Sequence, residues 1–264
     1  MKLGLGGRVA LVGGASSGLG AATAERLALE GAQVLLVSRS TERLERAVRR
    51  IRRAGDTVVE GCAVDLTEPD GPARAAAAAE AAFKAPPTVV VANGGGPPSM
   101  PALAADAADL EGAARLLLLP VQRLLHATLD GMREAGWGRF VAITSVAVRQ
   151  PQPGLVLSNA LRAAVTGYLR SVADEVAADG ITVNTVCPGY TATERLDELA
   201  AAVAARDGVE PAEVFAAWAA KAPVGRLLEP AEVAAAVAFL CSAPASGITG
   251  VALAVDGGFS RGLL

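Results

Sequence analysis

The chain has 264 residues, of which 52% are hydrophobic, 19% are charged and only 3% are aromatic, and its formal net charge is −3. This composition is typical of a globular protein and excludes an intrinsically disordered one. The small negative charge argues against a nucleic-acid partner, because such proteins usually carry a basic footprint. The single histidine, His126, cannot form a multi-histidine site, and we expect no metal.

The cysteines and the longest apolar run indicate where the protein works. Cys62, Cys187 and Cys241 are odd in number and widely spaced, which favours a reducing, cytoplasmic location over a disulfide framework. The strongest apolar run, Leu116–Val121, falls far below the ~20 residues that a membrane-spanning helix needs. We expect no membrane partner and no secretory leader.

Short apolar runs alternate with longer helical patterns along the whole chain. The runs are flanked by Gly, Pro, Asp or Asn, as expected of strands that are buried on both faces. The predicted strands are Val9–Val12, Gln33–Val37, Thr57–Cys62, Thr88–Ala92, Arg139–Thr144, Thr182–Val186 and Val251–Val255. This alternation predicts an α/β fold, in which a parallel sheet of about seven strands has helices on both faces.

The helical patterns are amphipathic, and no linker divides them. The clearest helix carries Leu44, Val48 and Ile51 on one face and ends at Gly55. We therefore expect a single domain over residues 1–264. The segment at about 193–222 is longer than a simple strand-helix-strand unit requires. It is predicted to be a helical insertion that either forms a lid or simply packs on the domain.

A glycine-rich turn follows the first predicted strand and precedes a helix. Glycines let a backbone approach a pyrophosphate, and the helix N-terminus supplies N–H donors and a positive dipole end. The turn therefore predicts a dinucleotide site, although an ordinary tight turn between strand and helix is the alternative. The residues predicted to bind the cofactor here are Gly14, Ser16, Ser17, Gly18, Leu19 and Gly20.

The end of the second predicted strand indicates which dinucleotide binds. An NAD site usually has an acidic residue there for the ribose 2′-hydroxyl, but this chain has Ser38, Arg39 and Ser40. A cation and two hydroxyls suit a 2′-phosphate, so NADP(H) is favoured and NAD(H) remains possible. The alternative is that Arg39 is only a solvated loop residue.

The order of these motifs resembles the short-chain dehydrogenase/reductase family, especially its 3-oxoacyl-acyl-carrier-protein reductases. The likeness runs nearly end to end, and it implies a single-domain Rossmann-type fold and hydride transfer between NADP(H) and a carbonyl or alcohol substrate. The motifs that carry it are Gly14-x3-Gly18-x-Gly20, Asp65-Leu66, Asn93-Gly94, Ile143-Thr144-Ser145 and Pro188-Gly189-x3-Thr193. The resemblance implies that Asp65, Leu66, Asn93, Gly94, Pro188, Gly189 and Thr193 also bind the cofactor.

The catalytic positions depart from the pattern of the family. Ser145 matches the family's catalytic serine, but Ser158 and Arg162 stand at the places of the Tyr and Lys of its Tyr-x-x-x-Lys motif. Leu117 stands near the place of its catalytic Asn. Ser145, Ser158 and Arg162 are the predicted catalytic residues, and Arg162 is also expected to bind the nicotinamide ribose.

Three functions remain open from the sequence. The chain is an oxidoreductase with a rearranged site, or it binds NADP(H) in a binding or regulatory role, or the cofactor is only structural. In the first case the proton comes from Ser158 through water, from Arg162, or from Tyr190. The substrate is then a small ketone or alcohol, for example a 3-oxoacyl thioester.

The substrate is expected beyond the carboxyl ends of the strands. The segments Gly94–Pro101 and Val146–Pro153 and the insertion should reach it, with Arg149 and Gln150 either contacting a polar substrate group or facing solvent. The resemblance also implies a homotetramer or homodimer, in which two long helices, roughly Leu103–Glu134 and Leu155–Ala178, pack against their copies. Cys187 and His126 are expected to have packing or solvent-exposed roles only.

Overall fold

The computed structural model describes residues 2–262, and seven strands in this part of the chain form one parallel sheet in the order β3-β2-β1-β4-β5-β6-β7. Each predicted strand is present, with its ends shifted by no more than two residues. The strands are β1 (Val9–Gly13), β2 (Gln33–Ser38), β3 (Val58–Ala63), β4 (Val89–Ala92), β5 (Gly138–Ile143), β6 (Ile181–Pro188) and β7 (Ala252–Val255).

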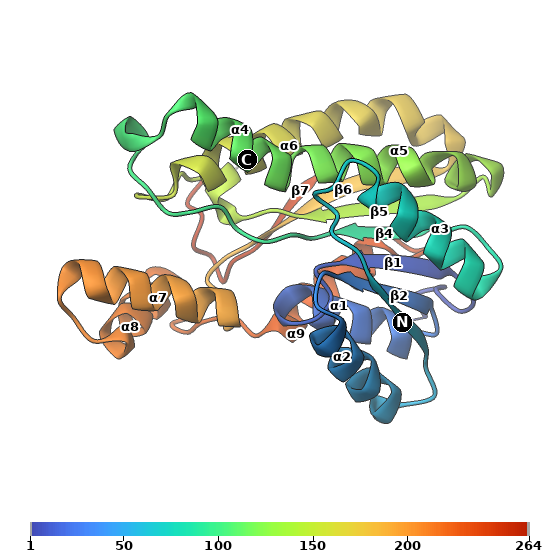
Figure 1. The fold of residues 1–264 in the computed structure, drawn as a ribbon, viewed down its shortest axis with the longest axis horizontal. Helices are drawn as coiled ribbons and strands as arrows, with labels where there is room; N and C mark the ends of the chain where they lie inside the picture. The colour runs from blue at the N-terminus through green and yellow to red at the C-terminus, as the bar shows by residue number, and fades with distance from the viewer. Residues whose placement is uncertain (1, 263–264) are drawn as a thin grey trace.

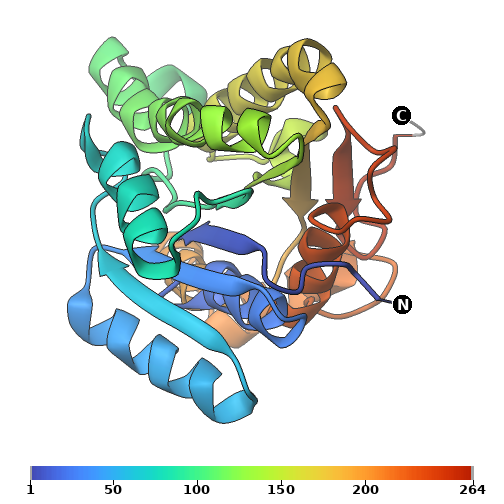
Figure 2. The same ribbon diagram turned by 90° about the vertical axis from the view of Figure 1, so that its right-hand side faces the viewer.

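Helices cover both faces of this sheet, as predicted for a doubly wound fold (Figures 1 and 2). The helices are α1 (Gly18–Leu29), α2 (Thr41–Ala54), α3 (Gly71–Phe83), α4 (Ala107–Leu117), α5 (Leu119–Glu134), α6 (Val156–Val176), α7 (Glu194–Asp207), α8 (Pro211–Lys221) and α9 (Pro230–Leu240). In Figure 1, α1, α2 and α9 lie below the sheet and α3, α5 and α6 lie above it. No helix within residues 2–262 is long and apolar enough to cross a membrane.

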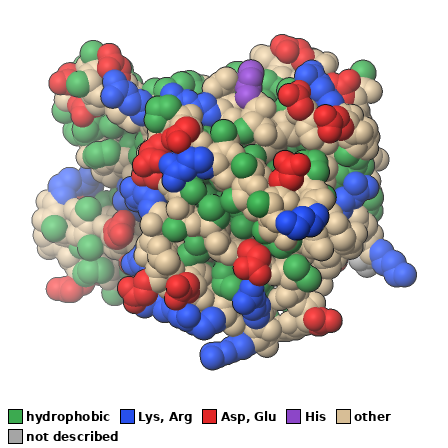
Figure 3. Space-filling view, turned by 45° about the vertical axis from the view of Figure 1, so that its right-hand side comes forward, with side chains coloured by type: hydrophobic (Ala, Val, Ile, Leu, Met, Phe, Trp, Pro, Cys, Tyr) green, Lys and Arg blue, Asp and Glu red, His purple; other side chains and the backbone are tan. Residues whose placement is uncertain are grey.

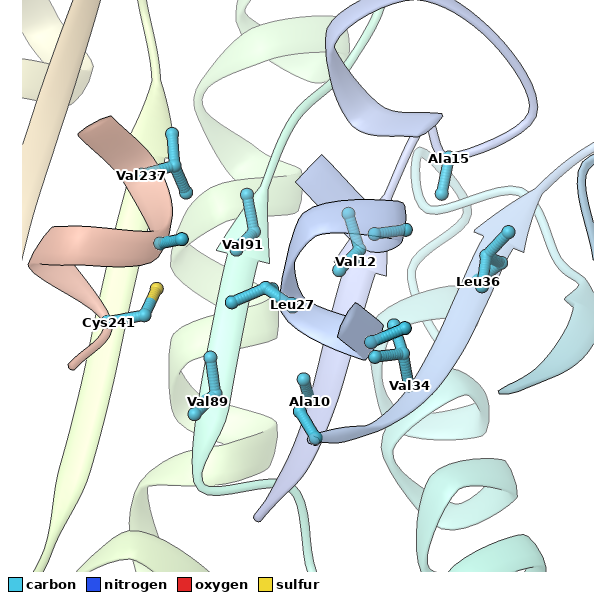
Figure 4. Close-up of a cluster of buried hydrophobic side chains, with 14 of the residues drawn as sticks. Ala10, Val12, Ala15, Leu27, Val34, Leu36, Val89, Val91, Val237 and Cys241 are labelled. Atoms are coloured by element: carbon cyan, nitrogen blue, oxygen red, sulfur yellow. The ribbon is translucent and has the colours of Figure 1, made fainter. Parts of the chain in front are cut away.

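Strand residues alternate between two hydrophobic cores, because successive side chains of a strand point to opposite faces. In β1, Ala10 and Val12 pack below the sheet with Leu27 of α1, while Val9 and Leu11 pack above it. The lower core is drawn in Figure 4, where residues of β1, β2 and β4 meet α1 and α9. Burial on both faces explains why the strands are almost purely apolar.

The helix expected over Leu103–Glu134 is interrupted, which corrects that prediction. A short 3₁₀ turn at Ala102–Ala104 is followed by α4, and α5 begins at Leu119. Pro120 lies in the first turn of α5 and has no N–H to donate to the carbonyl of Leu116, so the helical hydrogen bonding cannot continue through it. The helix expected over Leu155–Ala178 is present as α6, and a 3₁₀ turn at Ala177–Asp179 follows it.

The segment at 193–222 forms helices α7 and α8, which have a small hydrophobic core of their own. Leu196, Ala200 and Ala204 of α7 pack against Val214 and Trp218 of α8. Figure 1 shows this helical pair projecting away from the sheet, beyond α9. Thr193 caps α7 by accepting a hydrogen bond from the Leu196 amide at 3.3 Å.

The turn after β1 is too crowded for any residue but glycine at two positions. Gly14 has a φ of +58°, which side-chain-bearing residues rarely adopt, and a Cβ there would lie 2.7 Å from Nδ2 of Asn93. A Cβ at Gly20 would collide with the carbonyl oxygen of Gly14. Asn93 itself donates to the carbonyl oxygen of Gly13 at 3.2 Å, so the ends of β1 and β4 are tied together.

Replacing Gly20 by alanine should therefore destabilise the protein, by about 1–3 kcal/mol, because the added methyl group forces the turn apart. The matched control is Gly112→Ala in α4, where a Cβ meets nothing within 4 Å. That change should leave stability unchanged or raise it by up to about 1 kcal/mol through helix propensity. Urea unfolding midpoints measure both, and a Gly20→Ala protein as stable as the wild type would contradict the crowding.

Candidate functional site

A cleft of about 630 Å³ lies at the carboxyl ends of the strands. It opens where the chain runs outward from β1 to one half of the sheet and from β4 to the other, which is the position where open α/β sheets bind ligands. Its walls come from the turns after β1 to β6, from parts of α4, α5 and α6, and from the first turns of α7.

Most of the predicted site residues line this cleft together. Gly20 and Ser40 do not: Gly20 packs against Gly14 below the turn, and Ser40 caps α2 by accepting a hydrogen bond from the Arg43 amide at 3.4 Å. The predicted residues that line the cleft are Gly14, Ser16, Ser17, Gly18, Leu19, Ser38, Arg39, Asp65, Leu66, Asn93, Gly94, Ser145, Ser158, Arg162, Pro188, Gly189 and Thr193.

The glycine turn offers unpaired backbone donors to the cleft. Ser17 precedes α1, but its side chain makes no capping hydrogen bond, and the first turn of α1 contains no acidic residue. The first N–H groups of a helix have no partner within the helix, so these donors remain available to an anion. Gly18 and Leu19 lie at the cleft surface. The residues present therefore fit the pyrophosphate of a dinucleotide.

Beyond the turn, the cleft carries hydroxyl and charged groups from the ends of β2 and β3. Ser38 donates to Oγ of Ser16 at 2.9 Å, and Arg39 approaches Asp65 at 3.9 Å. Arg39 is highly exposed, with 78% of its side chain accessible, so this ion pair is loose. The carboxylate of Asp65 is also held by Thr67, whose amide and hydroxyl donate to it at 2.9 and 2.8 Å.

At the opposite end of the cleft, the guanidinium of Arg162 is held by backbone carbonyls. Nη1 donates to the carbonyl oxygens of Ile143 and Thr144, both at 3.1 Å, at the end of β5. Nη2 donates to the carbonyl of Gly95 at 3.3 Å, in the loop after β4. Nε donates to Oγ of Ser158, one helical turn earlier on α6, at 3.2 Å. These four hydrogen bonds fix the position of the charge.

The charge of Arg162 has no carboxylate beside it within residues 2–262, since every acceptor of its hydrogen bonds is neutral. Burial and, to a smaller extent, the nearby charge of Arg195 lower the pKa of Arg162 to about 10. A positive charge that is desolvated and not neutralised favours negative charge that develops next to it.

Two serine hydroxyls in the cleft are left free to donate. Oγ of Ser145 accepts from the Ala147 amide at 3.1 Å, and Oγ of Ser158 accepts from Arg162. Because each oxygen already accepts a hydrogen bond, the remaining O–H is available to a ligand. The site can therefore present two hydroxyl donors and one cation to a carbonyl oxygen.

Several residues considered from the sequence lie elsewhere. Tyr190 does not line the cleft; its ring stacks on Trp218 with centroids 4.9 Å apart and meets Phe259 edge-on at 5.6 Å, and its hydroxyl donates to Gln152 at 3.3 Å. These contacts support a packing role for Tyr190. Residues 146–153, which were expected to reach the substrate, do not line the cleft, although Ser145 before them and Leu155 after them do.

Four other residues considered from the sequence also lie outside the cleft: Arg149, Gln150, Cys187 and His126. Arg149 donates to the carbonyl of Ala252 at 2.5 Å and is exposed, as is Gln150. Cys187 is buried, with Sγ 3.3 Å from Oγ1 of Thr144, and burial raises the pKa of its thiol. His126 is exposed on α5, away from the cleft.

Sequence reasoning missed several residues that line the cleft. Arg43 of α2 pairs with Glu194 of α7 at 3.2 Å, and Arg195 donates from Nη2 to the carbonyl of Pro97 at 3.0 Å. These contacts join segments that are roughly 100 or more positions apart, so they cannot be predicted from a local sequence pattern. The apolar lining at this end comes from Leu116, Leu117, Leu155, Leu196 and Leu199.

Comparison with known proteins gives relatives over nearly the whole chain. The family model for enoyl-(acyl carrier protein) reductase matches residues 14–260. Cis-4-hydroxycyclohexanecarboxylate dehydrogenase of Sinomonas cyclohexanicum is 36% identical over 253 residues, which cover 96% of each protein. The 3-oxoacyl-[acyl-carrier-protein] reductase of Vibrio cholerae is 33% identical over 252 residues, which cover 96% of this chain and 97% of the relative.

The solved structures agree with these matches. L-sorbose reductase from Gluconobacter frateurii, in a crystal structure with NADPH and L-sorbose, has a TM-score of 0.93 and 31% identity over the full length of both chains. The motifs along this chain, the doubly wound fold and these relatives point to one group of proteins. The chain therefore belongs to the short-chain dehydrogenase/reductase family of oxidoreductases.

Proposed function

We propose that this chain is an NADP(H)-dependent oxidoreductase that interconverts a carbonyl and an alcohol, with Ser145, Ser158 and Arg162 as its catalytic residues. The observation that carries the proposal is that these three side chains meet in the same cleft as the glycine turn. The named relatives support the reaction class, because they are dehydrogenases and reductases.

The choice of NADP(H) over NAD(H) rests on the end of β2. Arg39 and Arg43 both line the cleft there, beside the hydroxyls of Ser16 and Ser38, and a 2′-phosphate would add charge-assisted hydrogen bonds to such a set. The structure of L-sorbose reductase was determined with NADPH, which supports the same choice. A related 3-ketoacyl-(acyl-carrier-protein) reductase from Brucella melitensis was solved with NADH, so a weaker NAD(H) activity is compatible with the fold.

The hydroxyls of Ser145 and Ser158 would bind the oxygen of the substrate carbonyl. A bound reduced nicotinamide supplies the hydride for the carbonyl carbon. As negative charge develops on the oxygen, both O–H groups and the fixed charge of Arg162 stabilise it. The reverse reaction, oxidation of an alcohol, uses the same contacts.

The proton for the oxygen would come from Ser158, and Arg162 would replace it. Nε of Arg162 already donates to Oγ of Ser158, so the hydroxyl proton can pass to the substrate while the guanidinium proton moves to Oγ. The neutral guanidine would then regain a proton from water at its exposed Nη2 side. Burial lowers the pKa of Arg162 to about 10, which is the ordinary value for a tyrosine phenol. In this arrangement the pair at positions 158 and 162 does the work of the Tyr-x-x-x-Lys motif. The site is thus an atypical one for the family.

Helices α7 and α8 would act as a lid, because Glu194 and Arg195 at the start of α7 already contact opposite walls of the cleft. A homotetramer or homodimer would use the exposed faces of α5 and α6. Free thiols at Cys62, Cys187 and Cys241 suit a reducing cytoplasm.

Replacing Arg39 by leucine should weaken NADPH binding about tenfold, because one charge-assisted contact to the 2′-phosphate is lost. NADH, which lacks this phosphate, should bind within about twofold of its wild-type affinity. Titration of the nucleotide fluorescence measures both constants. An equal loss for the two nucleotides would contradict the role given to Arg39.

Removing either serine hydroxyl should slow catalysis while leaving NADPH binding intact. We expect Ser158→Ala to lower kcat about 10²–10⁴-fold, because the proton donor is lost, and Ser145→Ala to lower it about 10²-fold, because one donor to the developing charge is lost. Steady-state assays on a panel of ketones and 3-oxoacyl thioesters measure these effects. Tyr190→Phe is the control and should keep its activity. Loss of activity in Tyr190→Phe would show that the proton comes from Tyr190 and not from Ser158.

The rate of ketone reduction should fall as pH rises above about 10, because Arg162 must be protonated and burial lowers its pKa to about 10. Below that pH the guanidinium keeps its charge, so kcat should not change with pH on account of Arg162. In Arg162→Lys the same burial acts on an amine with an ordinary pKa of about 10.4, so the limb should move to lower pH. Stopped-flow assays after a brief pH jump avoid unfolding, and an unchanged limb in Arg162→Lys would show that another group titrates.

A further inference from the structure

The charged side chains along the cleft are paired with one exception. Four arginines and three carboxylates line it, which leaves one positive charge in excess. Figure 3 shows basic and acidic side chains interspersed over the face of the molecule that it draws. The ion pairs within the cleft are Arg39–Asp65 at 3.9 Å, Arg43–Glu194 at 3.2 Å and Arg195–Glu198 at 3.1 Å.

Arg162 is the unpaired cation, but it has little capacity left to bind a ligand directly. A guanidinium has five N–H donors, and four of them already serve Ser158 and three backbone carbonyls. Arg162 therefore contributes charge to this end of the cleft without being free to move toward a ligand.

Arg195 is the cation that can receive a ligand. Only two of its five donors are engaged, one with the carbonyl of Pro97 at 3.0 Å and one with Glu198 at 3.1 Å. The side chains of Arg195 and Glu198 are 51% and 67% exposed, and an exposed ion pair of this kind contributes little stability. An anion on a bound ligand could displace Glu198 at low cost.

Arg162 and Arg195 both donate hydrogen bonds to the loop after β4, so one small molecule could contact both of them. Arg162 binds the carbonyl of Gly95 and Arg195 binds that of Pro97, two residues further along. Two residues of extended chain span at most about 7 Å. The charge of Arg195 also lowers the pKa of Arg162, as expected for guanidinium groups that are close neighbours.

The lining of the cleft also includes four apolar side chains, those of Leu116, Leu117, Leu155 and Leu199. A ligand that fits such a pocket has a compact apolar body, a carbonyl at Ser145 and Ser158, and an anionic group at Arg195. Arginine is suited to this last contact, because its planar fork can bind a carboxylate or phosphate through two parallel hydrogen bonds.

We propose that Arg195 binds an anionic group of the substrate and thereby selects negatively charged carbonyl compounds over neutral ones. The anion is a carboxylate on a compact oxo acid or the phosphate of a thioester carrier arm. This inference rests on the proposed function for the position of the reacting carbonyl. The relative that acts on cis-4-hydroxycyclohexanecarboxylate is named for a substrate with a carboxylate, which is consistent with the first source.

Binding tests the inference without requiring turnover. Calorimetry on the NADPH-saturated, full-length protein compares cyclohexanecarboxylate with its neutral amide, and coenzyme A with pantetheine. We expect the anionic member of at least one pair to bind 10-fold or more tightly, and this preference to disappear in Arg195→Gln. Glu198→Gln removes the competing carboxylate and should strengthen anion binding severalfold. Arg206→Gln, an exposed position further along α7, should change nothing.

Activity assays then distinguish a substrate carboxylate from a carrier-arm phosphate. They also test the proposed function separately from the anion site at Arg195. The substrate pairs are 4-oxocyclohexanecarboxylate with its methyl ester, and acetoacetyl-coenzyme A with the N-acetylcysteamine thioester. An Arg195-dependent KM preference for the oxo acid assigns a carboxylate, and one for the coenzyme A thioester assigns a phosphate. Arg195→Lys keeps the charge without the fork and should retain part of the preference, which guards against a misfolded Arg195→Gln.

Equal binding within both pairs, or a preference that survives in Arg195→Gln, overturns the inference whatever the enzyme reduces. The proposed function fails in a different way: none of the four carbonyl compounds is reduced. If Arg195-dependent anion binding is found in an inert protein, the inference stands and the proposed function does not.

Discussion

The arrangement of the cleft depends on one strand pair, β1 beside β4, at the centre of the sheet. The chain places β2 and β3 on one side of this pair and β5, β6 and β7 on the other, so the connections that leave β1 and β4 diverge. The space between them can be filled by a ligand, while the sheet below stays closed. Asn93 keeps the two strand ends at a fixed separation by donating to the carbonyl of Gly13. The glycine turn can approach a ligand because this pair holds it in place.

Arg162 is the second constraint, because its hydrogen bonds connect three elements at the edge of the cleft. Its guanidinium joins the end of β5, the loop after β4 and Ser158 on α6. Desolvating a cation without a neighbouring carboxylate costs free energy, and neutral carbonyl acceptors offset only part of that cost. A ligand or transition state with negative charge would offset more of it. The structure thus places a desolvated charge with only neutral hydrogen-bond acceptors where the reaction that we propose develops an oxyanion.

The sequence predicted the sheet well and the cleft unevenly. The strands could be recognised because burial on both faces makes them apolar, and the glycine turn because steric crowding requires glycine at positions such as Gly14 and Gly20. The interruption between α4 and α5 follows from Pro120, a local signal that the prediction of one long helix overlooked. The contact between Arg195 and Pro97 could not be predicted, because it joins segments 98 positions apart. Tyr190 was a reasonable candidate by position along the chain, but its aromatic neighbours on α8 and at Phe259 hold it outside the cleft.

The hydrogen bond between Ser158 and Arg162 has a consequence for how this site can change in evolution. A larger side chain at position 158 takes the place of the oxygen that accepts from Nε, and a shorter cation at position 162 gives up several backbone carbonyls at once. Substitutions at residues that share contacts are not additive, so the effect of either change depends on the other. The residue at position 162 therefore sets what a substitution at position 158 does to the site, and the reverse is also true.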